Sequence, residues 1–204
     1  TGVQTCALPI SYSVTNAISG SGSVVILTGS LALAGTNSYQ GGTVVRGGTL
    51  AVPAGAVVSH PTAGVTLGSV SGDVATLLLQ GGGLTGSTGI VGSGSGSFGT
   101  ATVSGGTWSS VGGLTVGQSG TGSVLLTGSG AVVVGGGTGT ITLASAALSS
   151  GTLTFSTTLT SGTVQAATIT SGSGTAAVVF QQPGTYGVQP LLAGGLSVTQ
   201  SGSG

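Results

Sequence analysis

The chain has 204 residues and no formal net charge, and only 1% of its residues are charged, whereas 45 are glycine. The scarcity of charge excludes the basic patch that nucleic acid or anionic lipid would require. The combination of 38% hydrophobic residues with almost no charge is also unlike that of a disordered chain. Val, Thr, Ile and Leu interleaved with Gly predict an all-β protein, and no apolar run reaches the ~18 residues of a membrane helix.

The first ten residues, Thr1–Ile10, differ from everything that follows. They hold the single cysteine, Cys6, together with a proline and no glycine pair. They also resemble the translation of a common sequencing-library adapter. The resemblance implies that residues 1–10 are a non-native scar that takes no part in the fold. Residues 11–204 are then expected to form one cysteine-free unit.

Short strands separated by glycine turns are predicted from the start of this unit, around Ser13–Ile18 and Ser23–Leu27. The pattern is clearest in Leu31–Val52, where short runs of strand-forming residues alternate with glycine pairs. Gly35-Thr36-Asn37 is interpreted as a turn within this stretch. Period-two alternation bounded by Gly and Asn predicts strand, turn and strand in succession. Because no run is long enough to form a core alone, each is expected to stack on a neighbour.

The stretch Leu31–Val52 resembles the autotransporter-associated β-strand repeat. The matching positions are Leu31, Leu33, Gly35, Asn37, Tyr39, Gly41, Gly42, Thr43, Val45, Gly48, Thr49 and Leu50. The resemblance implies a right-handed parallel β-helix that belongs to the passenger of a bacterial autotransporter, exported across the outer membrane to the cell surface or beyond. It implies a structural role for Tyr39 and stacking on neighbouring repeats of the same chain, and it names no ligand.

Beyond this repeat, Pro53–Val65 is interpreted as a looser turn region. Three later segments then align on Leu67, Val91 and Val116, which are 24 and 25 residues apart. Each is followed by a Gly/Ser-rich turn, an apolar run, a second glycine turn and an outer strand. A period in this range is typical of solenoids, in which each unit buries its apolar face against the next.

After Gly135 the alternation of hydroxyl and apolar side chains becomes regular and predicts half-buried strands. Three Thr-x-Thr pairs occur there: Thr140/Thr142, Thr152/Thr154 and Thr168/Thr170. Stacked on one flat face, such pairs would resemble the threonine arrays of ice-binding β-helices. A ligand-binding solenoid with a threonine-rich face is therefore an alternative function, although steps of 12 and 16 residues do not keep one register.

The end of the sequence returns to the pattern of its beginning. Gly195–Gly204 resembles Ser11–Ser30, and in the resembled family such a segment leads into another repeat. We therefore expect an internal segment of a longer passenger, whose end turns lack the polar caps that solenoids need.

Chemistry is sparse, and no catalytic, cofactor-binding or metal-binding residue is predicted. One carboxylate, Asp73, and one imidazole, His60, are available, and a set of Ser71, His60 and Asp73 has little specificity among so many serines. Asp73 is more typical of a turn residue. A paired-carboxylate glycosidase site lacks its second acid, and three or four metal ligands cannot be assembled.

Three further features have structural interpretations. The Gly94-x-Gly96-x-x-Gly99 run matches a dinucleotide fingerprint, but without a following helix it indicates a turn. Trp108 is expected to pack against cross-strand neighbours rather than to bind a sugar, and Arg46 is expected to be a solvated turn residue. The function predicted from the sequence is therefore a structural stalk segment, with adhesion as a role that only the family resemblance implies.

Overall fold

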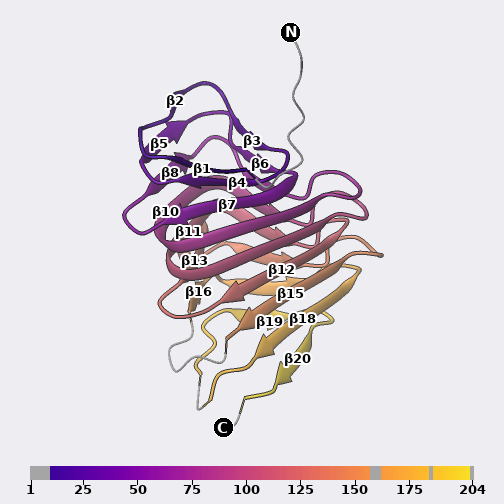
Figure 1. The fold of residues 1–204 in the computed structure, drawn as a ribbon. Coiled ribbons are helices and arrows are strands. Elements are labelled where there is room, and N and C mark those ends of the chain that lie inside the picture. Colours follow the sequence, from indigo (N-terminus) through magenta and orange to yellow (C-terminus); the bar gives the residue numbers. More distant parts are fainter. Residues whose placement is uncertain (1–9, 157–161, 184–185, 203–204) are drawn as a thin grey trace.

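The computed structural model describes residues 10–156, 162–183 and 186–202, and it shows an all-β chain wound into about seven stacked turns. Every strand pairing is parallel and joins a strand to its counterpart one turn later (Figure 1). This confirms the predicted parallel β-solenoid. Residues 1–9 of the adapter-like segment lie outside the described residues. The carbonyl oxygen of Ile10 accepts a hydrogen bond from the backbone N–H of Ser30 at 2.8 Å.

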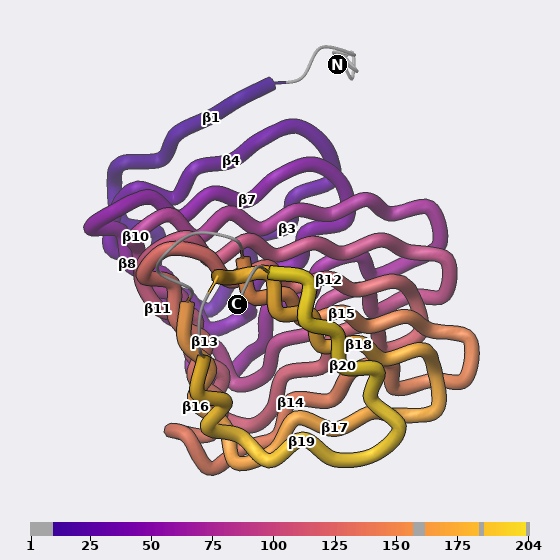
Figure 2. The backbone as a smooth tube through the Cα atoms, turned by 90° about the horizontal axis from the view of Figure 1, so that it is seen from below, coloured from indigo at the N-terminus to yellow at the C-terminus, as the bar shows by residue number. Residues whose placement is uncertain are grey.

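Each full turn contributes strands to three faces, here called faces A, B and C, which form the three sides of the stack seen from below (Figure 2). Face A consists of β1 (Ser11–Val14), β4 (Ser30–Leu33), β7 (Gly47–Pro53), the first parts of β10 (Val74–Val91) and β11 (Phe98–Val116), β12 (Thr121–Leu126), β15 (Ser150–Phe155), β18 (Thr175–Phe180) and β20 (Ser197–Gln200). Face B consists of β2 (Ser19–Gly20), β5 (Thr36–Tyr39), β8 (Val57–His60), the middle parts of β10 and β11, β13 (Ala131–Val134) and β16 (Thr163–Gln165).

Face C consists of β3 (Val24–Ile26), β6 (Thr43–Val45), β9 (Val65–Leu67), the last parts of β10 and β11, β14 (Thr140–Leu143), β17 (Thr168–Ser171) and β19 (Leu191–Ala193). A short 3-10 helix, η1 (Gly135–Gly137), follows β13. The two long strands β10 and β11 pass through all three faces because their glycines bend the strand at the corners without ending it. The register shifts of β10 against β11 fall at these bends, between Leu79 and Gly83 and between Gly86 and Thr88.

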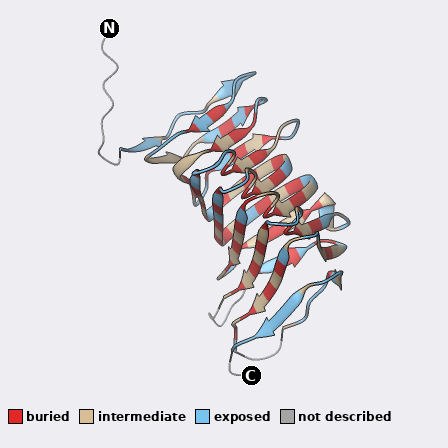
Figure 3. Cartoon of the chain, turned by 90° about the vertical axis from the view of Figure 1, so that its right-hand side faces the viewer, coloured by how far each residue is buried: buried red, intermediate tan, exposed pale blue. Residues whose placement is uncertain are grey.

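Alternate side chains point into the stack and form ladders that run along its axis. One of them, here called the central ladder, takes one residue from each strand of face A. Its members are Tyr12, Leu31, Leu50, Leu77, Ala101, Val124, Leu153, Val178 and Val198. All members from Leu50 to Val178 have no exposed surface. Figure 3 shows the same alternation as buried stripes along the strands. This continuous apolar ladder holds successive turns together.

The predicted period is confirmed. Leu67 pairs with Val91, Val91 with Val116 and Val116 with Leu143, all on face C. The chain turns sharply after each of them through a residue with positive φ: Gly68 (68°), Gly92 (70°), Gly117 (76°) and Ala144 (53°). These residues form the corner between faces C and A. Ala144 is the one non-glycine residue with positive φ among the described residues.

Two interpretations of loops were wrong in part. Thr36-Asn37 belongs to strand β5, and strand β8 lies in the middle of Pro53–Val65. The glycine turns at Gly81–Gly83 and Gly105-Gly106 are present as corners within continuous strands, and the Trp108 side chain is buried in the core. Prolines, a histidine and clustered glycines obscured the alternation in these places.

Candidate functional site

A buried polar cluster at the corner between faces B and C joins two residues of Leu31–Val52 to His60 in the following turn. The hydroxyl groups of Tyr39 and Thr43 are 2.5 Å apart, and Oγ1 of Thr43 lies 3.1 Å from Nε2 of His60. Nδ1 of His60 lies 3.0 Å from the carbonyl oxygen of Ala63. The Tyr39 and His60 rings are 5.3 Å apart between centroids, and all three side chains are buried. The cluster thus joins two successive turns.

The partners fix the direction of this hydrogen-bond chain when the ring is neutral. A carbonyl oxygen only accepts, so Nδ1 of His60 donates to Ala63 and Nε2 accepts from the Thr43 hydroxyl. The Tyr39 hydroxyl then donates to Thr43. Burial raises the pKa of Tyr39, and the hydrogen bond with Thr43 offsets part of this rise. Each polar atom has a partner, so the arrangement stabilises the corner and leaves neither ring nitrogen of His60 free for chemistry.

Asn37 connects three successive turns through its side-chain amide. Its Oδ1 accepts a hydrogen bond from the backbone N–H of Ile18 at 3.1 Å in the preceding turn. Its Nδ2 donates to the carbonyl oxygens of Gly35 at 2.9 Å and of Val57, in the following turn, at 3.3 Å. The side chain is fully buried. The sequence interpretation missed this role, although the position of Asn37 in the resembled repeat pattern was a signal that the residue matters.

Asp73 and Arg46 form a second polar cluster at the corner between faces C and A. Oδ2 of Asp73 accepts hydrogen bonds from the backbone N–H groups of Ser69 and Val70, both at 2.9 Å. Nε of Arg46 lies 3.4 Å from the same oxygen. Although burial opposes ionisation of the carboxyl, the hydrogen bonds from Val70, Ser69 and Arg46 lower the pKa of Asp73 overall.

This geometry confirms Asp73 as a turn residue. Arg46 lies at a bend with 42% of its side chain exposed, as expected of a solvated turn residue, and it also pairs with Asp73 of the following turn. The structure does not assemble the set of Ser71, His60 and Asp73. The side-chain hydrogen bonds of His60 go to Thr43 and Ala63, and those of Asp73 go to Ser69, Val70 and Arg46. Over residues 10–156, 162–183 and 186–202, no group of three His, Cys, Asp or Glu side chains could hold a metal ion.

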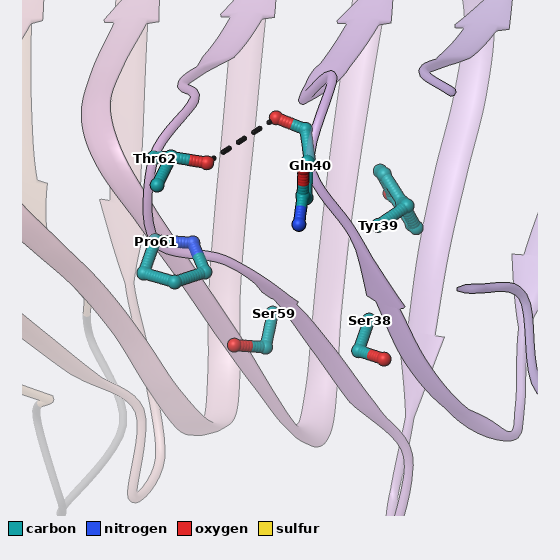
Figure 4. A pocket seen from close by; sticks show the side chains of 6 residues that line it. All are labelled: Ser38, Tyr39, Gln40, Ser59, Pro61 and Thr62. Carbon is teal, nitrogen blue, oxygen red and sulfur yellow. Dashed lines mark hydrogen bonds between the residues drawn. The ribbon is translucent and has the colours of Figure 1, made fainter. Parts of the chain in front are cut away.

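A groove of about 330 Å³ lies beside β5 and β8 of face B and includes Tyr39 of the polar cluster in its lining (Figure 4). It is lined by Ser38, Tyr39, Gln40, Ser59, Pro61 and Thr62. The Thr62 hydroxyl donates to the carbonyl oxygen of Gln40 at 3.5 Å. The lining carries no charge, and its serines belong to paired positions of β5 and β8. The groove thus lies between two stacked turns, and the outward side chains of Ser38 and Ser59 form part of its lining.

The three Thr-x-Thr pairs occupy two different faces. Thr140 pairs with Thr168 and Thr142 with Thr170 on face C. Thr152 and Thr154 lie on β15 of face A, where they pair with Ser123 and Leu125. The alternative function requires all three pairs on one flat face, and the structure does not provide that face.

Trp108 is buried, with 1% of its surface exposed, as its structural interpretation predicted. It belongs to an inward ladder of face B between Leu84 and Val132.

The run from Gly94 to Gly99 forms the corner between β10 and β11 and the start of β11. No helix follows it, so the turn interpretation is confirmed.

Comparison with known families identifies one match, the passenger-associated-transport-repeat, over residues 28–52. The matched segment contains β4, β5 and β6 and most of β7, which together make one complete turn and the beginning of the next. The identification of a passenger repeat in Leu31–Val52 is thereby confirmed. Neither the curated proteins nor the solved structures gave a match to the chain. In the described part of the chain, no helix is both long and apolar enough to cross a bilayer.

Proposed function

We propose that this chain is a structural stalk segment in the passenger of a bacterial autotransporter, exported to the cell surface or the extracellular space. The observation that carries the proposal is the passenger repeat at residues 28–52 folded as one turn of a continuous solenoid. The central ladder extends through this turn and the later ones, so the repeat is one layer of a longer rod. The rod converts chain length into reach, at about 4.8 Å per turn.

The side chains support a mechanical role and not a catalytic one. His60 and Asp73 are both buried in hydrogen-bond networks that join successive turns. Arg46, the single basic residue among Lys and Arg, is paired with Asp73. This leaves no basic surface for nucleic acid. The proposed partners are therefore neighbouring turns of the same polypeptide, and adhesion to another surface would depend on features other than charge.

Deleting a whole turn tests the idea that the turns are interchangeable layers. Val116 and Leu143 occupy equivalent positions on face C. Removal of Gly117–Leu143 joins Val116 to Ala144 and should leave a folded solenoid that is one turn shorter. The matched control removes Gly117–Gly130, which deletes one strand of face A and joins the end of face C directly to face B. We expect this control to lose its cooperative unfolding transition, and equal damage by both deletions would contradict the proposal.

Export is tested separately in the producing bacterium. Antibodies raised against the purified chain should label intact cells, and external protease should remove the label. Labelling that requires permeabilised cells would contradict the proposed location while leaving the solenoid architecture intact.

A further inference from the structure

The groove beside β5 and β8 is built from neutral side chains of two consecutive turns. Ser38 and Gln40 belong to the passenger repeat, whereas Ser59, Pro61 and Thr62 belong to the following turn (Figure 4). Ser38 pairs with Ser59, so their backbone positions are about 4.8 Å apart. The volume of about 330 Å³ lies at the lower end of the range of ligand sites, about 300–1,000 Å³. The groove therefore has the size for one small ring.

Three side chains of the groove present hydrogen-bonding groups to a ligand. Ser38 and Gln40 are exposed, and Ser59 is half-buried. A hydroxyl group both donates and accepts, and the Gln40 amide adds two donor hydrogens and an acceptor oxygen. The hydrogen bond that crosses the groove, from the Thr62 hydroxyl to the carbonyl oxygen of Gln40, uses the backbone of Gln40 and not its amide. Figure 4 shows this side chain extended toward the space between Pro61 and Tyr39.

The lining of the groove is uncharged, and this restricts the class of ligand. Arg46 and Asp73 pair with each other at a different corner, between faces C and A. A charged ligand in the groove would lose hydration without meeting an opposite charge. A neutral ligand with hydroxyl groups can instead exchange its bonds with water for bonds with the serines and Gln40, and an apolar face can pack on the exposed ring of Pro61. A sugar ring has both features.

The backbone of the two strands is closed to a peptide. β5 pairs with β2 and β8, and β8 pairs with β5 and β10, so neither strand has a free edge. Strand addition, in which an extended peptide bonds to the edge of a sheet, is therefore impossible at this site. Recognition depends on the side-chain hydroxyl and amide groups, and this favours a sugar over a peptide.

Hydroxyl groups continue beyond the groove along the axis of the stack. Ser38 and Ser59 belong to a ladder of outward side chains, here called the outward ladder of face B. Its members are Ser19, Ser38, Ser59, Thr85, Ser109, Val133 and Gln165. All members from Ser19 to Ser109 carry a hydroxyl group, at about 4.8 Å per turn. A linear chain of sugars that lies along this ladder meets a hydroxyl group at each of these turns.

We propose that the groove binds one sugar unit of a neutral, linear polysaccharide whose chain lies along the outward ladder of face B. Ser38 and Gln40 hydrogen-bond to hydroxyl groups of this unit, and Pro61 packs against its C–H face. The site goes beyond the stalk role. It needs only two stacked turns, so it does not depend on whether the chain is exported.

Nitrogen–proton NMR of the full chain tests this site with three neutral hexasaccharides: cellohexaose, maltohexaose and mannohexaose. The signal of the Gln40 side-chain amide is assigned by its loss in Gln40→Ala. At least one of the three sugars should shift this signal. Oligogalacturonate, which is anionic, and an uncharged peptide of Gly and Ser are the comparators and should leave it unchanged.

Titration followed at the backbone amide of Ser59 gives the affinity of each variant. The double substitution Ser38→Ala and Gln40→Ala should lower the affinity about tenfold. Gln165→Ala is the matched control, because Gln165 is exposed on the same ladder, four turns after Ser59, and it should bind like the unaltered chain. The NMR spectra also show that both variants are folded. The proposal is overturned if none of the three sugars shifts the Gln40 amide, if a comparator shifts it as strongly, or if the double variant binds as tightly as the control.

Discussion

The indole ring of Trp108 fills the space that a side chain at Gly89 would occupy. A Cβ atom on Gly89 would lie 2.8 Å from Cζ2 of Trp108 and 2.8 Å from Cδ1 of Leu114. Gly89 lies on an inward ladder of face C, whose other members include Val65 and Leu114. The turn that contains Gly89 therefore lacks a side chain at this point of the core. The large side chain of Trp108, in the next turn, fills the space that Gly89 leaves.

Gly89→Ala should destabilise the fold by about 1–3 kcal/mol, because the added methyl group overpacks the core against a rigid ring. Gly83→Ala is the matched control, since a Cβ atom there meets nothing within 4 Å. The control should change the free energy of unfolding by no more than about 0.5 kcal/mol. Urea denaturation of both variants measures the difference, and equal stability would contradict the described packing of Trp108.

The corner at Gly117 tests how closely the turns approach one another. Gly117 has φ of 76°, and a Cβ atom on it would collide with the carbonyl oxygen of Ser150 in the next turn. Gly72 has φ of 84° but would meet nothing within 4 Å, so Gly72→Ala reports the backbone strain alone. We expect a loss of about 1 kcal/mol for Gly72→Ala, and at least about 2 kcal/mol for Gly117→Ala. Equal losses in thermal or urea unfolding would show that the neighbouring turn does not restrict this corner.

Thr43→Val should destabilise the fold by about 2–4 kcal/mol, since it leaves two buried groups, the Tyr39 hydroxyl and Nε2 of His60, without their partner. Tyr39→Phe should have a smaller effect, because the Thr43 hydroxyl can still donate to His60. Thr66→Val, an outward position of the same face, is the control. The order expected in urea denaturation is Thr43→Val, then Tyr39→Phe, then the control. A Thr43→Val variant as stable as the control would refute the hydrogen-bond chain.

Stability should decrease in acid, as Asp73 is protonated, and in alkali, as the buried tyrosines are deprotonated. The lowered pKa of Asp73 stabilises the fold above the unfolded-state pKa of about 3.9, and this contribution is lost as the pH falls through the folded-state pKa. Burial raises the pKa of Tyr39 and of Tyr186. Their contribution is complete below the unfolded-state value of about 10 and is lost as the pH rises above it.

Urea midpoints at pH 3, 5, 9 and 11 measure this profile. Asp73→Asn should remove much of the acid decrease, and the double substitution Tyr39→Phe and Tyr186→Phe should remove much of the alkaline one. An acid decrease that Asp73→Asn leaves unchanged, or an alkaline decrease that the double substitution leaves unchanged, would contradict this assignment.

The sequence predicted the architecture well wherever glycine turns separated apolar runs of regular spacing. Leu67, Val91 and Val116 were aligned by their period, and they do form one ladder. Sequence patterns did not predict β5 and β8, because the inward positions of these strands include Asn37, Tyr39 and His60, which interrupt the apolar alternation. Their polarity is compensated by hydrogen bonds to adjacent turns, and such partners become visible only when the register is known.

The unknown register of the turns also explains why the sequence did not predict the polar clusters. Arg46 and Asp73 are 27 residues apart, about one turn, so their pairing depends on a register that the irregular segment between them concealed. Tyr39 and Thr43 meet His60 only in the following turn, so the sequence spacing alone does not indicate that the three form a cluster. The Thr-x-Thr pairs illustrate the opposite case, since their uneven spacing already indicated that they would not share one face.

Distances between spin labels at stacked outward positions of face A test the central claim, the stacking of turns in register, most directly. With Cys6 replaced by Ser, cysteines at Ser30 and at Thr100, Thr152 or Ala177 accept labels on positions three, five and six turns apart. At about 4.8 Å per turn, the distances between backbone positions should be about 14, 24 and 29 Å. Narrow distributions that increase linearly with the number of turns are expected. Broad distributions, or mean distances that differ from these three values, would contradict the solenoid and the stalk function built on it.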